Sequence, residues 1–503
     1  MKGWADRMAT HYRIKWAGLE LPGNGEGHFG IAGISGSGKT LALQTLARSV
    51  IPTIRDANPR ATAQRALVFD PENKFVPFLQ RLAGTENVHV LNPFDLRSRP
   101  WDLANEIEDL ASAQEMASNF VPEQPKDSQP FWQRNARAIL SAVFKALHLK
   151  APGRWTLRHV FHIMTSQARL AAVLKATDQT QSLLEVLEPT NTTLFNVLAE
   201  LRSHVDMLEI IAALWDNSVR LLGSKPFNIK EWLSGGSVLV FGRPTQLEDT
   251  FQILNRVLLR RISQLIRAPM SQEQINARGR TWIFLDELRN VGHLLGLEKL
   301  LTEGRSRGAR VVITFQDIDG LRQVYGENIA EEIVNQCDAM SYLRCRGTTA
   351  KWASQRIGRG EYWDRDMNEG GSRTSGGNSS STTNWGVHDR KQVSDIVLES
   401  EFSELALASL AERGGRRGAF IEGWHVIPQI GSIFPTRGSD AWYPFEAVLN
   451  EEDRFIPRPA EHQILRPWND DDWAEIGLGP QPSSKKRALP GRAMIEALRG
   501  THS

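Results

Sequence analysis

A glycine-rich turn followed by a lysine and a threonine is the part of this sequence whose chemistry is easiest to assign. Residues 33–40 fit the pattern GxxxxGK[ST], which binds phosphate groups. The glycines allow backbone N–H groups to point inward around phosphates, Lys39 reaches the β and γ oxygens, and the Thr40 hydroxyl binds Mg²⁺. The turn predicts a site for ATP and Mg²⁺ made by Gly33, Ser35, Gly36, Ser37, Gly38, Lys39 and Thr40.

An acidic pair follows a second apolar run. Asp286 and Glu287 come directly after Trp282–Leu285. In the site that we predict, Asp286 holds Mg²⁺ through water and Glu287 polarises the attacking water. An Asp-Glu pair after a buried strand is typical of ATPases that hydrolyse ATP for work. Taken alone, the pair would fit a helix N-cap with an acidic first turn equally well, and the glycine-rich turn favours the catalytic interpretation.

Two further polar residues flank the apolar run Ala309–Phe315. Gln316 ends it, where a side chain can touch the γ-phosphate or its water and report the state of the nucleotide. Arg305 lies in the turn before it, where an exposed arginine can reach the nucleotide of a neighbouring subunit. The alternatives are a helix cap or surface residue for Gln316 and a solvated basic turn for Arg305.

Short apolar runs predict the strands that position these residues. They alternate with helical patterns at the spacing of a parallel sheet with crossover helices. The predicted strands are His28–Ala32, Ala66–Asp70, Val88–Pro93, Ser237–Phe241, Thr281–Leu285, Ala309–Phe315 and Ala339–Leu343. The predicted fold class is therefore α/β, with a mainly parallel sheet.

The domain organisation follows from changes in pattern. Strand signals vanish over 101–226, which we expect to be an inserted all-α domain between two parts of the nucleotide-binding domain, 1–100 and 227–450. The Gly/Ser-rich range 369–391 predicts a mobile loop, and 451–503 predicts an extended, charged C-terminal tail.

Charge and composition exclude several classes of protein. Lys and Arg total 60 against 58 Asp and Glu, so a general polycation is excluded and any DNA contact must be local. The candidate basic surfaces are Arg260 and Arg261 with Arg267, and Arg413 with Arg416 and Arg417. The two cysteines form no CxxC pair, which excludes a disulfide framework and a zinc site, and we expect both to be buried small residues.

With these motifs in place, the chain resembles the conjugative coupling proteins of type IV secretion systems, the TraD-like group of RecA/FtsK-like P-loop ATPases. The resemblance is carried by the Glu-Gly-Arg turn, strand and glutamine of residues 300–316, with Gln-Val-Tyr-Gly at 323–326. It implies a RecA-like motor domain interrupted by an all-α domain, in a hexameric ring. Such a ring uses ATP to pump DNA, delivered by a relaxase, toward the secretion channel.

Carried over by motif, the resemblance implies that Lys39 and Thr40 bind the nucleotide and that Asp286 and Glu287 are the acidic pair. It implies that Gln316 is the sensor. Arg305 falls on the family's trans-acting arginine.

The sequence departs from the family in two places. Members usually carry two transmembrane helices ahead of the P-loop, and Met1 is too close to Gly33 for them. Either the anchor was trimmed from this chain, or a partner supplies it, or this is a soluble homologue with a modified task. We expect a cytoplasmic protein docked at the inner membrane through a partner, such as a separate anchor protein. Gly27 stands where some relatives carry an arginine. Two alternatives stay open: a soluble FtsK/HerA-type DNA-processing ATPase, and an adaptor that recruits a relaxase or effector with ATP as a switch.

Overall fold

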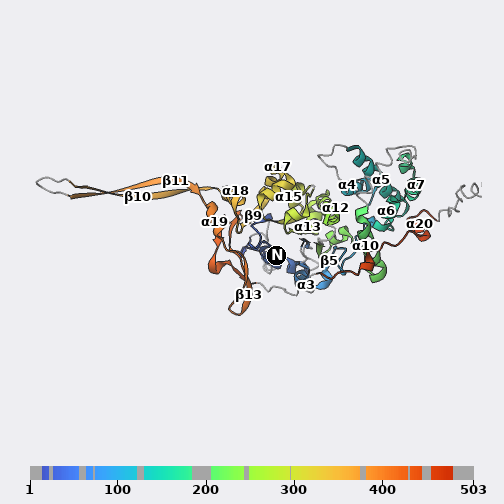
Figure 1. The fold of residues 1–503 in the computed structure, drawn as a ribbon, viewed down its shortest axis with the longest axis horizontal. Coiled ribbons are helices and arrows are strands. Elements are labelled where there is room, and N and C mark those ends of the chain that lie inside the picture. The colour runs from blue at the N-terminus through green and yellow to red at the C-terminus, as the bar shows by residue number, and fades with distance from the viewer. Residues whose placement is uncertain are drawn as a thin grey trace, which may run out of the picture. The chain divides into compact units, whose positions relative to one another are not determined.

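The structure is a computed structural model, and it divides the chain into two compact units (Figure 1). It describes residues 14–21, 27–55, 64–71, 74–121, 130–183, 206–242, 248–294, 296–373, 381–428, 431–444 and 455–479. The sheet unit comprises Met1–Ser98 and Ile229–Pro457, and the helical unit comprises Arg99–Asn228 and the C-terminal residues from Arg458 on.

A nine-stranded sheet forms the centre of the sheet unit, in the order β15-β14-β9-β3-β8-β7-β4-β6-β5. The pairings from β9 across to β5 are parallel, while β14 runs antiparallel to both β9 and β15. The strands are β3 (His28–Ala32), β4 (Arg65–Asp70), β5 (Val88–Val90), β6 (Val238–Gly242), β7 (Thr281–Leu285), β8 (Ala309–Phe315), β9 (Cys337–Tyr342), β14 (Gly423–Ile427) and β15 (Ser432–Thr436). The predicted α/β class with a mainly parallel sheet is confirmed.

Helices cover both faces of this sheet, because successive side chains of a strand alternate between faces. Trp282 and Phe284 of β7 belong to the core cluster that includes Leu43 and Leu46 of α2. The alternate residue Ile283 packs on the opposite face, against α12 and α15. The helices of this unit are α2 (Lys39–Arg55), α3 (Val76–Ala83), α11 (Ile229–Ser234), α12 (Glu248–Arg267), α13 (Gln272–Arg278), α14 (Leu288–Val291), α15 (Leu297–Ser306), α16 (Ile318–Tyr325), α17 (Glu327–Asn335), α18 (Gly347–Ile357) and α19 (Glu399–Glu404).

Three smaller β structures complete the sheet unit. A turn joins β1 (Lys15–Trp16) to β2 (Leu19–Glu20), and β12 (Ser409–Arg413), β13 (Arg416–Phe420) and β16 (Trp442–Pro444) form a three-stranded sheet. The third is a long two-stranded hairpin of β10 (Arg359–Arg373) and β11 (Ser381–Asp395), which Figure 1 shows as an extended ribbon. The loop that we predicted over 369–391 was therefore wrong wherever the structure describes this range. Its Gly/Ser-rich composition concealed a continuous antiparallel register.

In the part of the helical unit that the structure describes, the helices are α4 (Leu110–Phe120), α5 (Pro130–Lys150), α6 (Leu157–Met164), α7 (Gln167–Leu174), α8 (Asp178–Gln181), α10 (Glu209–Leu222) and α20 (Asp470–Glu475). Its last helix comes from the range predicted as an extended tail, and this prediction was wrong for residues 458–479. Arg158 of α6 binds Asp472 of α20 through two hydrogen bonds of 2.6 and 2.8 Å, and Asn217 of α10 donates to the His462 carbonyl at 3.0 Å. Contacts so distant in sequence leave no local pattern. Residues 480–503 lie outside the described part of the chain.

No helix within the described ranges has both the length and the apolar composition needed to cross a bilayer.

Candidate nucleotide-binding site

The glycine-rich turn connects β3 to α2 at the carboxyl edge of the sheet. Gly36 and Gly38 have φ angles of 77° and 101°, the left-handed region in which glycine meets no steric penalty. A Cβ atom on Gly33 would lie 2.5 Å from Ser37 Oγ, so a side chain at Gly33 would disturb the turn. The Lys39 ammonium donates to the carbonyls of Gly33 at 2.8 Å and Ile34 at 3.2 Å. The turn therefore has the backbone geometry of a phosphate-binding loop, with its lysine held across it.

A network of hydroxyl and carboxylate groups joins this turn to the carboxyl ends of β7 and β8. Thr40 Oγ1 donates to Asp286 Oδ2 at 2.9 Å, and Thr314 Oγ1 donates to Asp286 Oδ1 at 2.9 Å. The same Thr314 hydroxyl accepts the Glu287 backbone N–H at 2.7 Å. Thr314 lies in β8, between β3 and β7, and can therefore contact both. The structure thus brings together Thr40 and Asp286, the two residues that we expect to hold Mg²⁺.

Glu287 is held in an unusual backbone conformation beside Lys39. Its φ angle is 54°, a left-handed value that non-glycine residues adopt rarely and at some energetic cost. The Lys39 ammonium is 3.9 Å from Glu287 Oε2. Burial raises the pKa of the Glu287 carboxyl and nearby Asp286 raises it further, while Lys39 and hydrogen bonds from Gln316 oppose the shift. A carboxyl with a raised pKa is better suited to accept a proton than an ordinary glutamate.

The two other predicted residues lie at opposite edges of the sheet. Gln316 follows β8 at the carboxyl edge, where it lowers the pKa of the Glu287 carboxyl, so the structure brings it into the site. Arg305 lies in the last turn of α15, before β8 begins, which places it at the amino edge, roughly 20 Å away over the seven residues of the strand. The structure therefore does not bring Arg305 to the P-loop of its own chain, and Arg305 pairs with Asp338 instead, at 3.0 Å.

The sequence did not reveal two further contacts of the turn. Thr314 was included only as part of an apolar strand, and its one signal was a hydroxyl residue near the end of β8. The segment after α19 was also missed: Ala408 N donates to the Gly36 carbonyl at 3.0 Å, and a Cβ on Gly38 would lie 2.7 Å from Ala408 Cβ. The P-loop is thus packed against a segment about 370 residues further along the chain.

Other expectations were local and simpler. Asp70, at the end of β4, orders the turn before α3 by accepting the backbone N–H groups of Lys74 at 2.9 Å and Phe75 at 2.6 Å. Both cysteines are buried and free, as predicted, and burial raises the pKa of each thiol to about 12.

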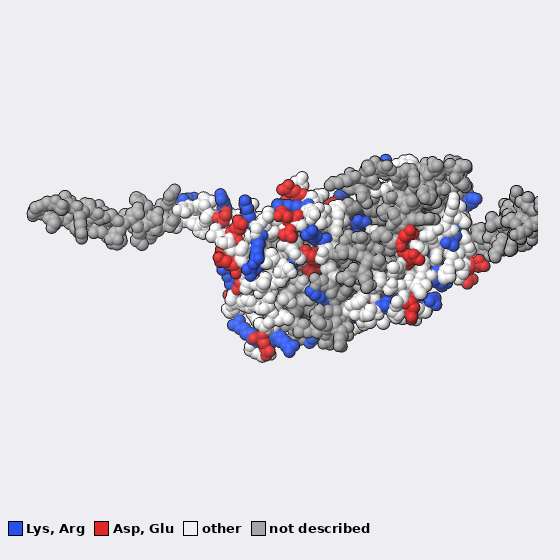
Figure 2. Space-filling model, in the orientation of Figure 1, with Lys and Arg blue, Asp and Glu red and all other residues white. Residues whose placement is uncertain are grey.

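The two candidate basic surfaces differ. The first does not present free cations: Arg261 is only 6% exposed, and Arg267 Nε binds Glu303 at 2.8 Å. The second is exposed. Arg413 and Arg416 stand directly opposite each other at the end of the β12–β13 hairpin, an arrangement that repels unless an anion neutralises it. Figure 2 shows basic side chains, with acidic ones among them, at this end of the molecule.

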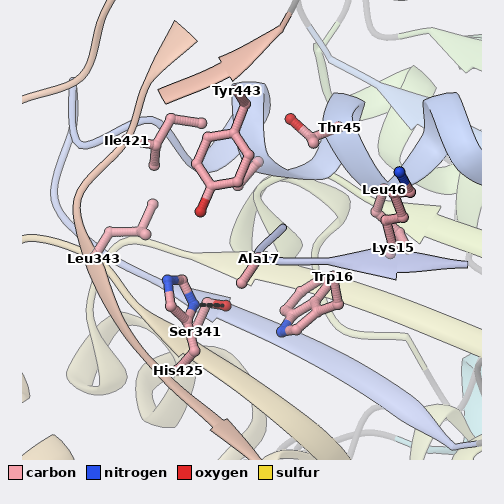
Figure 3. Close-up of a pocket in the computed structure, with 11 residues that line it drawn as sticks. Lys15, Trp16, Ala17, Thr45, Leu46, Ser341, Leu343, Ile421, His425 and Tyr443 are labelled. Carbon is pink, nitrogen blue, oxygen red and sulfur yellow. Dashed lines mark hydrogen bonds between the residues drawn. The ribbon is translucent and has the colours of Figure 1, made fainter. Parts of the chain in front are cut away.

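A pocket of about 340 Å³ lies beside α2, lined by Trp16, Thr45, His425 and Tyr443 among others (Figure 3). His425 is buried between two hydroxyls, with Nδ1 2.7 Å from Ser341 Oγ and Nε2 2.8 Å from Thr436 Oγ1. Burial lowers its pKa to about 3, so the ring is neutral at physiological pH. Both ring nitrogens are satisfied, and we interpret this histidine as part of the core.

The helical unit contains a cluster of ligand-type side chains, His159, Asp472 and Glu475. His159 Nδ1 accepts the Thr156 backbone N–H at 3.0 Å, so the ring proton is on Nε2, the nitrogen that faces the carboxylates. Asp472 is already bound by the Arg158 guanidinium. A protonated nitrogen next to a guanidinium cannot bind a metal ion, and we assign no metal site here.

Comparison with known proteins is consistent with this geometry. Residues 13–412 match the family model described as the type IV secretion-system coupling protein DNA-binding domain. The chain is 23% identical over 343 residues to Coupling protein TraD of Escherichia coli K12, covering 67% of this chain and 44% of TraD. It is 25% identical over 151 residues to Conjugal transfer protein TraG of Agrobacterium fabrum, covering 27% and 22% of the two chains. The chain thus spans less than half the length of these curated relatives.

A solved structure has the same fold. The plasmid coupling protein TrwB, in complex with ADP and Mg²⁺, superimposes with a TM-score of 0.64 at 20% identity, covering 91% of this chain and 95% of TrwB. The predicted RecA-like α/β fold with an all-α domain is confirmed. Because the family model covers most of the chain, this protein belongs to the type IV secretion-system coupling protein family.

Proposed function

We propose that this chain is an ATP-hydrolysing motor that moves DNA, delivered by a relaxase, to the channel of a type IV secretion system. The observation that carries the proposal is the network in which Thr314 holds Asp286 and Glu287 beside Thr40 and Lys39. It supports hydrolysis rather than binding alone, because it positions a glutamate of raised pKa next to the phosphate-binding lysine.

The residues present fit ATP and Mg²⁺. Ser37 Oγ is buried in the P-loop without a hydrogen-bond partner, and Thr40 with Asp286 supplies the hydroxyl and carboxylate oxygens that Mg²⁺ prefers. The relative TrwB binds ADP and Mg²⁺, which supports the same ligands here. Mg²⁺ would neutralise phosphate charge, Lys39 would bind the β and γ oxygens, and Glu287 would take the proton of the attacking water. Gln316, which lies beside the Glu287 carboxyl and lowers its pKa, would sense the γ-phosphate.

The motor acts as a homo-hexameric ring in this proposal. Arg305 lies at the sheet edge opposite its own P-loop, so it can serve a nucleotide only by reaching the site of an adjacent copy. DNA passes through the ring, and the exposed arginines of the β12–β13 hairpin are the best candidates for phosphate contacts. The ring docks at the inner membrane through a partner, and a relaxase supplies the DNA.

The test is Lys39→Ala in the full chain. We expect DNA-stimulated ATP hydrolysis and DNA transfer to be abolished, since the phosphate-binding cation is lost. Lys351→Ala is the matched control: Lys351 is an exposed lysine of α18, and its loss should change neither. ATPase rate should also rise steeply with protein concentration if neighbouring copies complete the site. Transfer by Lys39→Ala would overturn the motor proposal and favour an adaptor that recruits protein partners.

A further inference from the structure

Asp338, the second residue of strand β9, binds Arg305 with one carboxylate oxygen and a backbone N–H with the other. Oδ1 accepts Arg305 Nη1 at 3.0 Å, and Oδ2 accepts the His28 backbone N–H at 3.1 Å. The carboxylate therefore connects the end of α15 to the first residue of β3, the strand that carries the P-loop at its other end.

The surroundings keep this carboxylate in one place. Gly27 has a φ angle of 100°, and a Cβ atom there would lie 2.1 Å from Asp338 Oδ2, so the close approach requires glycine. The buried His28 ring accepts the Val311 N–H at Nδ1 (3.0 Å), which leaves Nε2–H to donate to the Leu301 carbonyl (2.7 Å). These bonds join β3, β8 and α15 around Asp338. Arg305 is thus paired with an acceptor whose position is fixed by three elements.

The geometry of the pair leaves Arg305 able to bind something else. Asp338 accepts a hydrogen bond from one of the five guanidinium N–H donors, and the side chains are 46% and 24% exposed for Arg305 and Asp338. The ion pair Arg158–Asp472 in the helical unit differs on both counts, with two hydrogen bonds and both side chains 0% exposed. The Arg158–Asp472 geometry is that of a structural ion pair, in which both terminal nitrogens of the guanidinium bind the carboxylate.

We propose that Asp338 is a positioning residue: it holds Arg305 extended from the amino edge of the sheet, with its remaining donors directed to the phosphates bound by the next copy of the chain. This inference rests on the proposed function. A flexible arginine must lose rotamer freedom when it engages a phosphate, and an arginine already held in place loses less. Asp338 therefore acts on the rate of hydrolysis at a neighbour's site and not on binding of ATP at its own.

The test is a double-mutant cycle between Asp338→Asn and Arg305→Ala, read as DNA-stimulated ATP hydrolysis by the full chain. An amide has one acceptor oxygen, so Asn at position 338 can serve Arg305 or the His28 N–H, but not both. We expect Asp338→Asn to lower kcat about tenfold, with the KM for ATP changed by less than about twofold. Arg305→Ala should lower kcat on the order of 10³-fold, and the double variant should be no worse than Arg305→Ala alone.

Two further variants make the result specific. Glu303 lies on the same helix as Arg305 and pairs with Arg267 of α12. Glu303→Gln breaks that pair without touching Arg305, and should leave kcat unchanged. Asp338→Glu keeps both acceptor oxygens and should recover part of the activity that Asp338→Asn loses.

Each contrary result has its own meaning. If Asp338→Asn lowers kcat by the same factor in the Arg305→Ala background, Asp338 is merely structural and the inference is wrong. If Asp338→Asn matches the wild type while Arg305→Ala is inactive, the inference fails but the role of Arg305 stands. If Arg305→Ala is fully active, both the inference about Asp338 and the role of Arg305 are wrong. Lys39→Ala still decides whether the chain is an ATPase.

Discussion

The carboxyl and amino edges of the nine-stranded sheet differ in how fully a charged side chain is buried and hydrogen-bonded within its own chain. At the carboxyl edge, Asp286 is buried and accepts hydrogen bonds from Thr40 and Thr314 of the same chain. At the amino edge, Arg305 is half exposed and has one hydrogen bond to Asp338. This difference supports our proposal that each chain holds its own phosphates at the carboxyl edge, and offers Arg305 at the amino edge to the site of an adjacent copy.

Mixing two inactive variants gives the strongest test of this contrast. Glu287→Gln removes the proton acceptor at the carboxyl edge, and Arg305→Ala removes the cation at the amino edge; each should lower kcat on the order of 10³-fold. In mixed rings, an Arg305→Ala copy still provides Glu287, and an adjacent Glu287→Gln copy still provides Arg305. An equal mixture should therefore recover about a quarter of the wild-type sites, measured as ATPase activity after co-assembly.

The control is a mixture of two variants at the same edge, Glu287→Gln with Lys39→Ala. Every P-loop site then carries a defect, whichever copy lies next to it, so no recovery is expected. Absence of recovery with Arg305→Ala as well would mean that the two edges do not meet between copies.

Acid should weaken the amino edge through His28. The pKa of its buried ring is lowered to about 4, because burial disfavours the charged form. The unfolded chain, with an ordinary histidine pKa near 6.5, therefore binds the proton first as the pH falls. The stabilisation is present in full above pH 6.5 and is lost between pH 6.5 and 4, by about 3 kcal/mol.

The measurement is urea unfolding of the wild type and His28→Gln between pH 7 and pH 4.5. Glutamine can donate to Leu301 and accept from Val311 but does not titrate. The variant should therefore lose less of its free energy of unfolding over this range than the wild type loses. Equal losses would show that His28 is not the group responsible.

How far the sequence predicts the molecule depends on the distance between the residues concerned. The P-loop and the pair Asp286–Glu287 are contiguous patterns, and each lies next to an apolar run, so both could be located together with their strands. The sequence could not show which strand lies between β3 and β7, and so Thr314 was overlooked. Asp338 was overlooked for the same reason, since its pairing with Arg305 depends on the sheet order.

Composition misled the prediction in the two other regions that the structure corrects. Glycine and serine between 369 and 391 suggested a loop, but a two-stranded ribbon needs only a continuous register of backbone bonds. The acidic run at Asn469–Asp472 suggested a solvated tail, whereas Asn469 caps α20 and Asp472 is buried against Arg158. Only in the second region is the partner distant in sequence, since Asp472 binds Arg158 314 residues away, whereas the ribbon is a local hairpin.

A substitution at Thr314 should have the smallest and most selective effect of those proposed, because it removes one hydroxyl at the carboxyl end of β8. This strand begins near Arg305 and is followed by Gln316. Thr314→Val keeps the shape of the buried side chain but removes the donor to Asp286 and the acceptor for the Glu287 N–H. One lost hydrogen bond to a charged group corresponds to about a tenfold fall in kcat, with ATP binding unaltered because Lys39 is unchanged. Thr314→Ser restores the hydroxyl and should restore the rate. If valine were as active as serine, the carboxyl edge would not depend on this network, and its order would come from the backbone alone.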